Sequence, residues 1–354
     1  MEIYIRGLAN ISPQETFNNS AFLEEPIEYN SAFFLSKEPS YRDFIDPIQS
    51  RRMGRIIKMG IASAMVALKD ANVEMPDAII TGTGLGCLED TEKFLTAMIK
   101  NNEQFLTPTS FIQSTHNTVS GQIALLLHCN NYNSTYVHRG FSFESTLMDA
   151  MMLLNEGEGK NILIGGIDEH NEHLFVIKQK MGLWKNPPCS NFSILNSTSQ
   201  GSISGEGAAF FVISSEKTAS DYAQIKSLHT FYKPENENVV IKSIHSALDE
   251  AGIGLEEIDV VVMGNSGDAL SDVIYHSLSG SLFKSKAQVA FKHLSGEYHT
   301  ASSFGLWLSA RILKEQIIPA VTRLNDNPLE SIKHVLFYNH YNNANHSVIV
   351  LSAC

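Results

Sequence analysis

Strand-like segments alternate with helix-like segments along this chain, and the second half repeats the plan of the first half in shorter form. Short apolar, β-prone runs predict strands, whereas apolar residues that recur every three or four positions predict helices. The expected strands cover residues 1–11, 78–81, 133–137, 161–169, 210–214, 223–229, 260–263, 334–338 and 346–352. Helices are expected over residues 52–71, 119–127, 144–154 and 239–251, and a turn and helix over 292–313. This alternation predicts an α/β protein of stacked layers, α/β/α/β/α, with two pseudo-repeats.

No shift in composition marks a boundary between independent domains. We divide the chain into two halves, 1–222 and 223–354, because a charged stretch at 215–222 separates the two repeats. Residues 12–50 are polar, carry four prolines and show no regular period. That composition predicts a surface excursion from the first half.

Charge and cysteine content exclude several classes of function. The net charge of −12 argues against nucleic acid or an anionic membrane as the main partner. No apolar run approaches the ~18 residues of a membrane span. The four cysteines are scattered and form neither a disulfide framework nor a zinc pattern. We therefore expect a cytoplasmic, reduced protein with no metal.

A glycine run at residues 82–86 raises the question of a nucleotide cofactor. The third glycine of a dinucleotide-binding pattern would fall at Cys87, so the spacing does not fit. Glycines where backbone segments pack closely explain the run better. We expect no cofactor.

The stretch at residues 136–145 predicts a strand, a sharp turn and the start of a helix. A helix that begins at such a turn presents free N–H groups and one side chain to a common point. Acyl-transfer enzymes place a nucleophile at this point. This chain offers Gly140, Phe141 and Ser142, and its nearest cysteine, Cys129, lies more than ten residues before Gly140.

Six short motifs occur in an order that resembles the β-ketoacyl synthase branch of the thiolase superfamily. The first is an Arg-Met pair that leads into the helix ending in Ala-Leu-Lys-Asp-Ala. The others are Gly-Thr-Gly-Leu-Gly at 82–86, Gly-Gln-Ile-Ala at 121–124, Gly-Gly-Ile-Asp-Glu at 165–169, Gly-Glu-Gly-Ala-Ala at 205–209, and Ala-Leu-Asp-Glu-Ala-Gly at 247–252. Because these motifs span nearly the whole chain, the resemblance implies a thiolase-like five-layered fold.

The resemblance also implies where the catalytic groups should lie. Members of the family condense acyl thioesters with a cysteine, two histidines and a lysine. In this chain Gly140 stands at the cysteine position, and Gly264 or Asn265 stands at the first histidine position. Lys292 matches the lysine, and Glu297 replaces the second histidine. Three of the four catalytic side chains are therefore expected to be missing.

These losses are similar to those in chain-length-factor subunits, which pair with an active synthase. Among them, the chain most resembles the ketosynthase-like subunits of aryl-polyene and flexirubin pigment pathways. The resemblance implies a non-condensing subunit that forms a dimer with an active ketosynthase or with itself, works with an acyl carrier protein and shapes the acyl tunnel in fatty-acid or polyketide-type biosynthesis. The residues expected at the tunnel are Phe111, Ile112, Gln113 and His116.

Two alternatives stay open at this point. Ser142 would serve as the nucleophile of a thioesterase or acyltransferase if the helix register were shifted by two residues. A homodimer that only binds acyl chains is the other alternative. The leftover polar groups also have structural interpretations: Glu297 as the partner of a buried ion pair with Lys292 or His299, and His138 and Arg139 as interface residues rather than a phosphate site.

Overall fold

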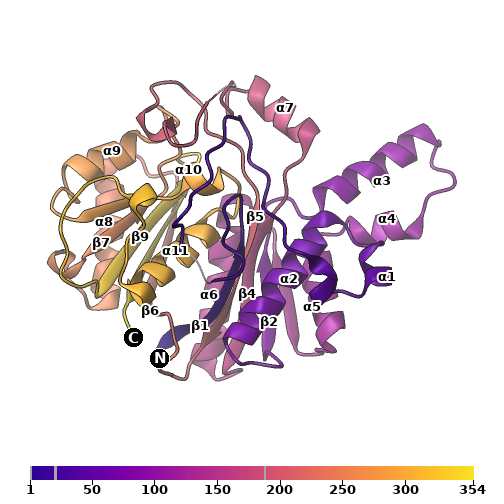
Figure 1. Ribbon diagram of the computed structural model, residues 1–354, viewed down its shortest axis with the longest axis horizontal. Helices are drawn as coiled ribbons and strands as arrows, with labels where there is room; N and C mark the ends of the chain where they lie inside the picture. The colour runs from indigo at the N-terminus through magenta and orange to yellow at the C-terminus, as the bar shows by residue number, and fades with distance from the viewer. Residues whose placement is uncertain (1, 20–21, 187–188) are drawn as a thin grey trace.

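A computed structural model describes residues 2–19, 22–186 and 189–354 of the protein (Figure 1). Within these ranges the strands form one ten-stranded sheet in the order β3-β2-β4-β5-β1-β6-β10-β9-β7-β8. The strands are β1 Ile3–Ile11, β2 Ala78–Gly82, β3 Tyr132–Tyr136, β4 Asn161–Asp168, β5 Gly207–Ser214, β6 Ala223–Tyr232, β7 Val260–Met263, β8 Ala287–Ala290, β9 His334–Tyr341 and β10 Asn345–Ser352.

The two halves of the sheet have the same topology. In the first half β2 pairs in parallel with β3 and β4, and β4 pairs antiparallel with β5; in the second half β7 pairs in parallel with β8 and β9, and β9 pairs antiparallel with β10. The halves join through antiparallel pairing of β1 with β6, where Tyr4 lies opposite Gln224. The predicted α/β fold with two pseudo-repeats is confirmed.

Helices cover the outer faces of both halves and fill the space between them. Helices α2 (Arg55–Asp70) and α5 (Thr118–Leu127) pack on the first half, and α8 (Glu237–Ala251) and α9 (Val273–Gly280) pack on the second. Helices α6 (Ser142–Glu156) and α11 (Ser302–Glu315) share one core cluster with strands of both halves. All residues of α11 from Ser302 to Leu313 are buried, as expected for a helix with no solvent face.

Several helices were not predicted from the sequence, and these helices bury few side chains. Helix α3 (Leu88–Lys100) buries only Asp90, and α7 (Glu172–Lys180) buries no residue. Helix α4 (Pro108–Gln113) follows α3, and together they form an arm that projects from the body (Figure 1). The remaining short helices are α1 Pro47–Ser50 and α10 Lys292–Ser295, with 3-10 turns η1 Tyr41–Asp43, η2 Arg139–Phe141, η3 Ile194–Asn196, η4 Leu255–Glu257 and η5 Ala320–Thr322.

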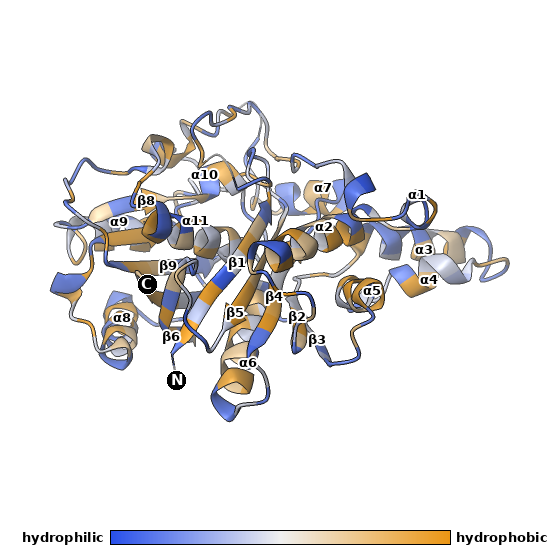
Figure 2. Cartoon of the chain, turned by 60° about the horizontal axis from the view of Figure 1, so that its bottom comes forward, coloured by the Kyte–Doolittle hydropathy of each residue, from blue (hydrophilic) through white to orange (hydrophobic). Residues whose placement is uncertain are grey.

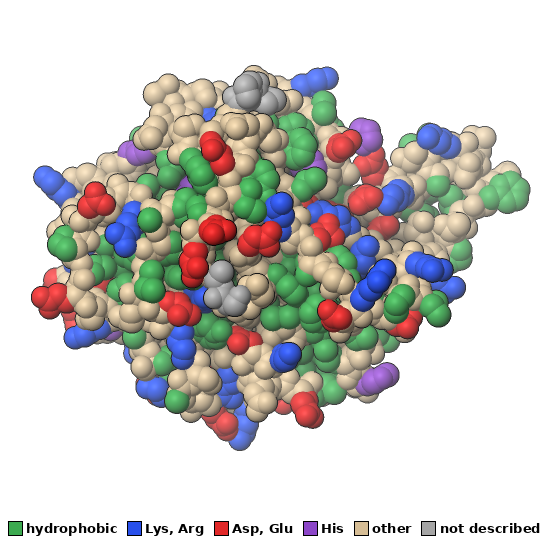
Figure 3. All heavy atoms as spheres, viewed as in Figure 1, with side chains coloured by type: hydrophobic (Ala, Val, Ile, Leu, Met, Phe, Trp, Pro, Cys, Tyr) green, Lys and Arg blue, Asp and Glu red, His purple; other side chains and the backbone are tan. Residues whose placement is uncertain are grey.

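Hydrophobic and charged residues are distributed differently over the molecule. The strands at the centre carry many hydrophobic residues, while hydrophilic residues collect in the connections (Figure 2). On the face seen in Figure 3, cationic and anionic side chains are interspersed, and the arm carries hydrophobic side chains at its tip. None of the described helices has both the length and the apolar character needed to cross a membrane.

Several side chains anchor residues 12–50, the predicted surface excursion, to the core. Phe22 and Phe34 are buried, and the Phe22 ring lies 5.9 Å from that of Trp307 on α11. Polar residues of the segment satisfy backbone groups inside it, as when Ile27 N donates to Gln14 Oε1 at 2.7 Å. A polar, irregular sequence therefore packs against the core because its side chains replace the missing ladder of hydrogen bonds.

Candidate functional site

The strand-turn-helix predicted around Gly140 is formed by β3, η2 and α6. Arg139 takes a left-handed conformation with φ 50°, which turns the chain sharply before the helix. Ser142 Oγ donates to Arg139 O and accepts from His138 N, each at 2.8 Å. The buried hydroxyl of Ser142 thus holds the turn together.

Ser142 lacks the surroundings of an activated nucleophile. Its side chain is fully buried, and within the described residues its hydroxyl forms hydrogen bonds with backbone atoms only. A serine nucleophile needs a general base within hydrogen-bonding reach. The geometry therefore gives the alternative based on Ser142 no support.

The space above Gly140 is filled by the β9–β10 hairpin. A Cβ atom at Gly140 would lie 2.7 Å from Tyr341 Cβ and 3.1 Å from Asn345 Cβ. Contacts below 3.0 Å between such atoms force a neighbour to move. The position expected for a nucleophile is thus closed by side chains of this chain.

The strands predicted over residues 334–338 and 346–352 are longer than expected and leave only a tight turn between them. The strands continue, so that Asn339 pairs with Ser347 and Tyr341 pairs with Asn345. The turn is short because Asn342 and Asn343 both take left-handed conformations, with φ of 50° and 48°. Asparagine tolerates this region better than other residues with a side chain, which permits a tight hairpin.

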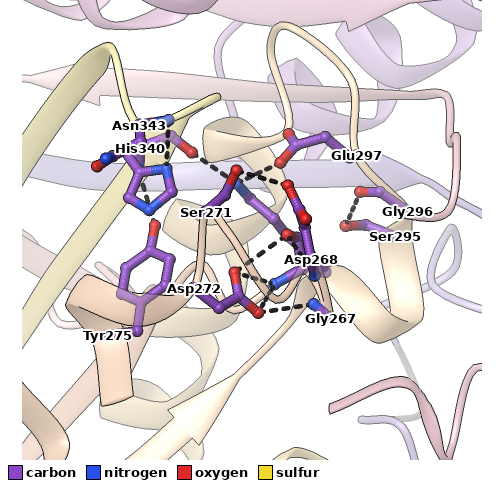
Figure 4. A network of polar contacts seen from close by, with 12 residues as sticks. Gly267, Asp268, Ser271, Asp272, Tyr275, Ser295, Gly296, Glu297, His340 and Asn343 are labelled. Carbon is purple, nitrogen blue, oxygen red and sulfur yellow. Dashed lines mark hydrogen bonds and ion pairs between the residues drawn. The ribbon is translucent and has the colours of Figure 1, made fainter. Parts of the chain in front are cut away.

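Lys292 and Glu297 form a buried ion pair below this hairpin. Lys292 Nζ donates to Glu297 Oε2 at 2.7 Å and to His340 O at 2.8 Å. Both side chains are almost fully buried. Burial raises the pKa of Glu297, and the charge of Lys292 opposes that shift. Figure 4 shows the network of polar contacts around this ion pair, with Glu297 and His340 on opposite sides of it.

Gly264, one of the two candidates for the first histidine position, is also closed. A Cβ at Gly264 would lie 2.3 Å from Asn339 Oδ1 and 3.2 Å from Lys292 Cε, so no imidazole fits there. The neighbouring Asn265 is buried. Downstream, the Asp272 carboxylate accepts from the backbone N–H groups of residues 266 and 267 and fixes the loop after β7 (Figure 4).

The structure brings together the four positions that the sequence assigned to catalysis. All of them meet the end of β9: Tyr341 lies over Gly140, Asn339 faces Gly264, and the carbonyl of residue 340 accepts from Lys292, the partner of Glu297. Within the described residues no group of three or more His, Cys, Asp or Glu side chains has the arrangement of a metal site.

A small cavity borders this cluster, and two of its wall residues, Lys178 and Trp184, were not found from the sequence. Its volume is about 40 Å³, and its walls include Lys178, Trp184, Glu297 and His299. This volume holds about three water molecules and no long acyl chain. Lys178 belongs to α7, a helix that was not predicted because its apolar period is weak. The folding of the chain brings it beside the site, although it is distant from Glu297 in the sequence.

Tyr341, which lies over Gly140, also contacts residues of the cavity wall. The His299 and Tyr341 rings stack with centroids 4.7 Å apart, and Lys178 Nζ lies 3.4 Å from Tyr341 Oη. Burial lowers the pKa of His299 to about 3, and the charges of Lys178 and Arg139 add to that effect. His299 is therefore a neutral imidazole at neutral pH.

The four residues predicted at the acyl tunnel lie on the arm and beside it, away from Gly140. Phe111 and Ile112 are 56% and 58% exposed on the arm, and the Phe111 ring lies 5.4 Å from that of Phe94. Gln113 donates to the carbonyl of residue 52. His116 packs against Gly86 at the cavity wall. Among the contacts of the described residues, none joins these four to Gly140.

Comparisons with known proteins agree with this architecture. The family described as β-ketoacyl synthase, N-terminal domain, matches residues 28–243. The 3-oxoacyl-[acyl-carrier-protein] synthase 2 of Staphylococcus aureus (strain N315) is 22% identical over 262 residues, which cover 67% of this chain and 62% of that protein. The chain thus matches less than two thirds of the length of this relative.

Solved structures with the same fold include two ketosynthases that are described together with a chain length factor. The ishigamide ketosynthase/chain length factor superposes with a TM-score of 0.82 at 20% identity, covering 100% of this chain and 99% of that chain. The ketosynthase ApeO in complex with its chain length factor ApeC, from Xenorhabdus doucetiae, gives a TM-score of 0.79 at 15% identity, with coverage of 100% and 98%.

Proposed function

Because this chain belongs to the β-ketoacyl synthase family, we propose that it acts as a non-condensing subunit of the chain-length-factor type. The observation that carries the proposal is the closed space above Gly140, where Tyr341 and Asn345 leave no room for a nucleophilic side chain. Condensation of thioesters by this family needs a thiolate, and glycine supplies none.

The groups that would assist a nucleophile are also replaced. An oxyanion is stabilised by hydrogen-bond donors directed at it, and decarboxylation needs the same help. Here Gly264 provides no side chain, and Glu297 provides a carboxylate whose oxygen is already bound to Lys292. A carboxylate at this position repels the negative charge that develops on the substrate. The site therefore favours a structural role of this chain over catalysis of the condensation.

The proposed partner is an active ketosynthase subunit, supplied with substrate by an acyl carrier protein. β3 lies at the end of the sheet order, so one of its edges has no partner strand among the described residues. Tyr132 and Val137 at this edge are 47% and 43% exposed. An exposed edge strand is a template for pairing across a two-fold axis, which would extend the sheet into a second subunit.

Within such a pair, the arm is proposed to set the length of the product. Phe111 and Ile112 expose apolar surface on α4 and are free to contact a second subunit. Gln113 and His116 would support them from the body side. The proposal includes the aryl-polyene or flexirubin type of pathway suggested by the sequence.

Co-expression with an active ketosynthase subunit tests the proposal. We expect the two chains to co-purify, the pair to condense malonyl and acyl thioesters, and this chain alone to be inactive. In the active pair, Phe111→Ala should lengthen the product, whereas Ile99→Ala on the outer part of α3 should not. Condensation by this chain alone would refute the non-condensing role; unchanged products from Phe111→Ala would refute the tunnel role of that residue.

The acyl-binding homodimer receives less support from the site. The cavity beside Glu297 holds about 40 Å³, which is far smaller than a fatty acyl chain. Native mass spectrometry of the purified chain distinguishes the two proposals. Retained lipid without any partner protein would favour the acyl-binding homodimer.

A further inference from the structure

Lys178 is a lysine on the inner side of α7 whose charge has no direct counter-ion. Its Nζ lies 3.4 Å from Tyr341 Oη and 5.3 Å from the centre of the Trp184 ring. No ion pair to Lys178 is found in residues 2–19, 22–186 and 189–354. The amine also borders the cavity that reaches Glu297 and His299.

The nearest carboxylates are engaged with other groups. Asp168 accepts from the backbone N–H groups of Gly84 and Thr300, each at 2.8 Å, and also from two threonine hydroxyls. Glu297 is bound to Lys292. These two carboxylates attract Lys178 only at longer range. Burial lowers the pKa of Lys178, Arg139 acts in the same direction, and Asp168 and Glu297 oppose the shift.

Desolvation without a direct counter-ion favours the uncharged amine, which is the nucleophilic form. His299, held neutral by its burial, stacks on the same Tyr341 ring that Lys178 contacts. Both lie on the wall of one cavity of about 40 Å³. This volume accommodates an acyl group of two or three carbons but not a long chain.

We propose that Lys178 accepts a short acyl group from a thioester. The Nζ atom attacks the thioester carbonyl, a C–N bond forms, and the C–S bond breaks with its electron pair leaving on sulfur. The proton released by the amine passes to the departing thiolate. The products are an amide on Lys178 and a free thiol, so no oxidant or further reactant is needed. This activity does not depend on pairing with a synthase.

Peptide mass mapping after incubation with acetyl thioesters tests this assignment. The full chain is treated at neutral pH with S-acetyl-N-acetylcysteamine, acetyl-CoA or acetylated carrier protein in separate reactions. We expect acetylation of Lys178 to be at least about tenfold faster than that of exposed Lys180 on the same helix. The most effective of the three donors identifies the natural source of the acyl group.

Two variants separate chemistry from folding. Lys178→Arg keeps a positive charge beside Tyr341 and should lose the adduct while melting at an unchanged temperature. Lys180→Met should leave the labelling of Lys178 unchanged. Faster acetylation of the more exposed Lys180 than of Lys178 with all three donors would overturn the proposal. The absence of any adduct at Lys178 would overturn it as well.

Discussion

At the scale of single residues, Gly140 is held in place by the side chains packed above it. Replacing it with alanine adds a Cβ 2.7 Å from Tyr341 Cβ, which forces the hairpin or helix α6 to shift. Overpacking of this kind costs about 1–3 kcal/mol. We expect Gly140→Ala to lower the free energy of unfolding by that amount, measured by urea denaturation.

Gly121 provides the matched control for this substitution. It lies inside α5, and a Cβ there would have no neighbour within 4 Å. Alanine in a helix interior is more stable than glycine by about 1 kcal/mol, so Gly121→Ala should raise stability. If Gly140→Ala were as stable as the wild type, the packing described above Gly140 would be wrong.

The buried pair of Lys292 and Glu297 leads to a prediction that depends on pH. Lys292→Met leaves the Glu297 carboxylate buried without its cation, which costs about 3–5 kcal/mol. Because burial raises the folded-state pKa of Glu297 above its unfolded value, the folded protein binds the proton more tightly. The variant should therefore lose stability relative to wild type as pH rises and regain it as pH falls.

Urea denaturation of both proteins at about pH 8 and about pH 5.5 measures this difference. Comparing the variant with wild type cancels the contribution of the other acidic groups. The double variant Lys292→Met/Glu297→Gln, compared with Glu297→Gln alone, serves as the control, since neither protein carries the titrating carboxyl group and the deficit should then be independent of pH. A deficit in Lys292→Met that grows on acidification would contradict the assigned ion pair.

At the scale of secondary structure elements, the β9–β10 hairpin closes the site, and its turn depends on Asn342 and Asn343. Both residues have φ near 50°, a region that costs other side chains about 1–2 kcal/mol. We expect Asn343→Val to destabilise the protein by about that amount and Asn343→Gly to be neutral or stabilising. Thermal unfolding followed by circular dichroism checks both; equal melting temperatures for the two variants would refute the left-handed turn.

At the scale of the whole molecule, the free edge of β3 is the proposed contact with the synthase. A lysine on an edge strand opposes pairing with another strand. Ser134→Lys should therefore abolish co-purification with the ketosynthase while the chain stays folded. Tyr232→Lys, at the exposed end of β6 in the interior of the sheet, serves as the control. Retention of the complex by Ser134→Lys, measured by light scattering after gel filtration, would place the interface elsewhere.

Much of this architecture was predictable because its signals are local. Residues 260–263 were predicted as a strand and form β7, and the strand predicted over 161–169 is β4, one residue shorter. Helix α7 was missed because its apolar residues form only a weak helical period. Helix α3 has a clear apolar period that was overlooked, although the helix buries only Asp90. The turn at Asn342 and Asn343 was missed because left-handed conformations leave little trace in composition.

The sequence by itself determined the layered α/β fold and the prediction that neither cysteine nor histidine stands at the family's catalytic positions, because periodicity and residue identity are properties of short segments. Only the tertiary structure decided that Tyr341 closes the space over Gly140, and that Glu297 is bound to Lys292. It also decided that Lys178 borders the same cavity as His299. Such contacts join residues far apart in the chain, and they arise from packing of one element on another, which no local pattern encodes.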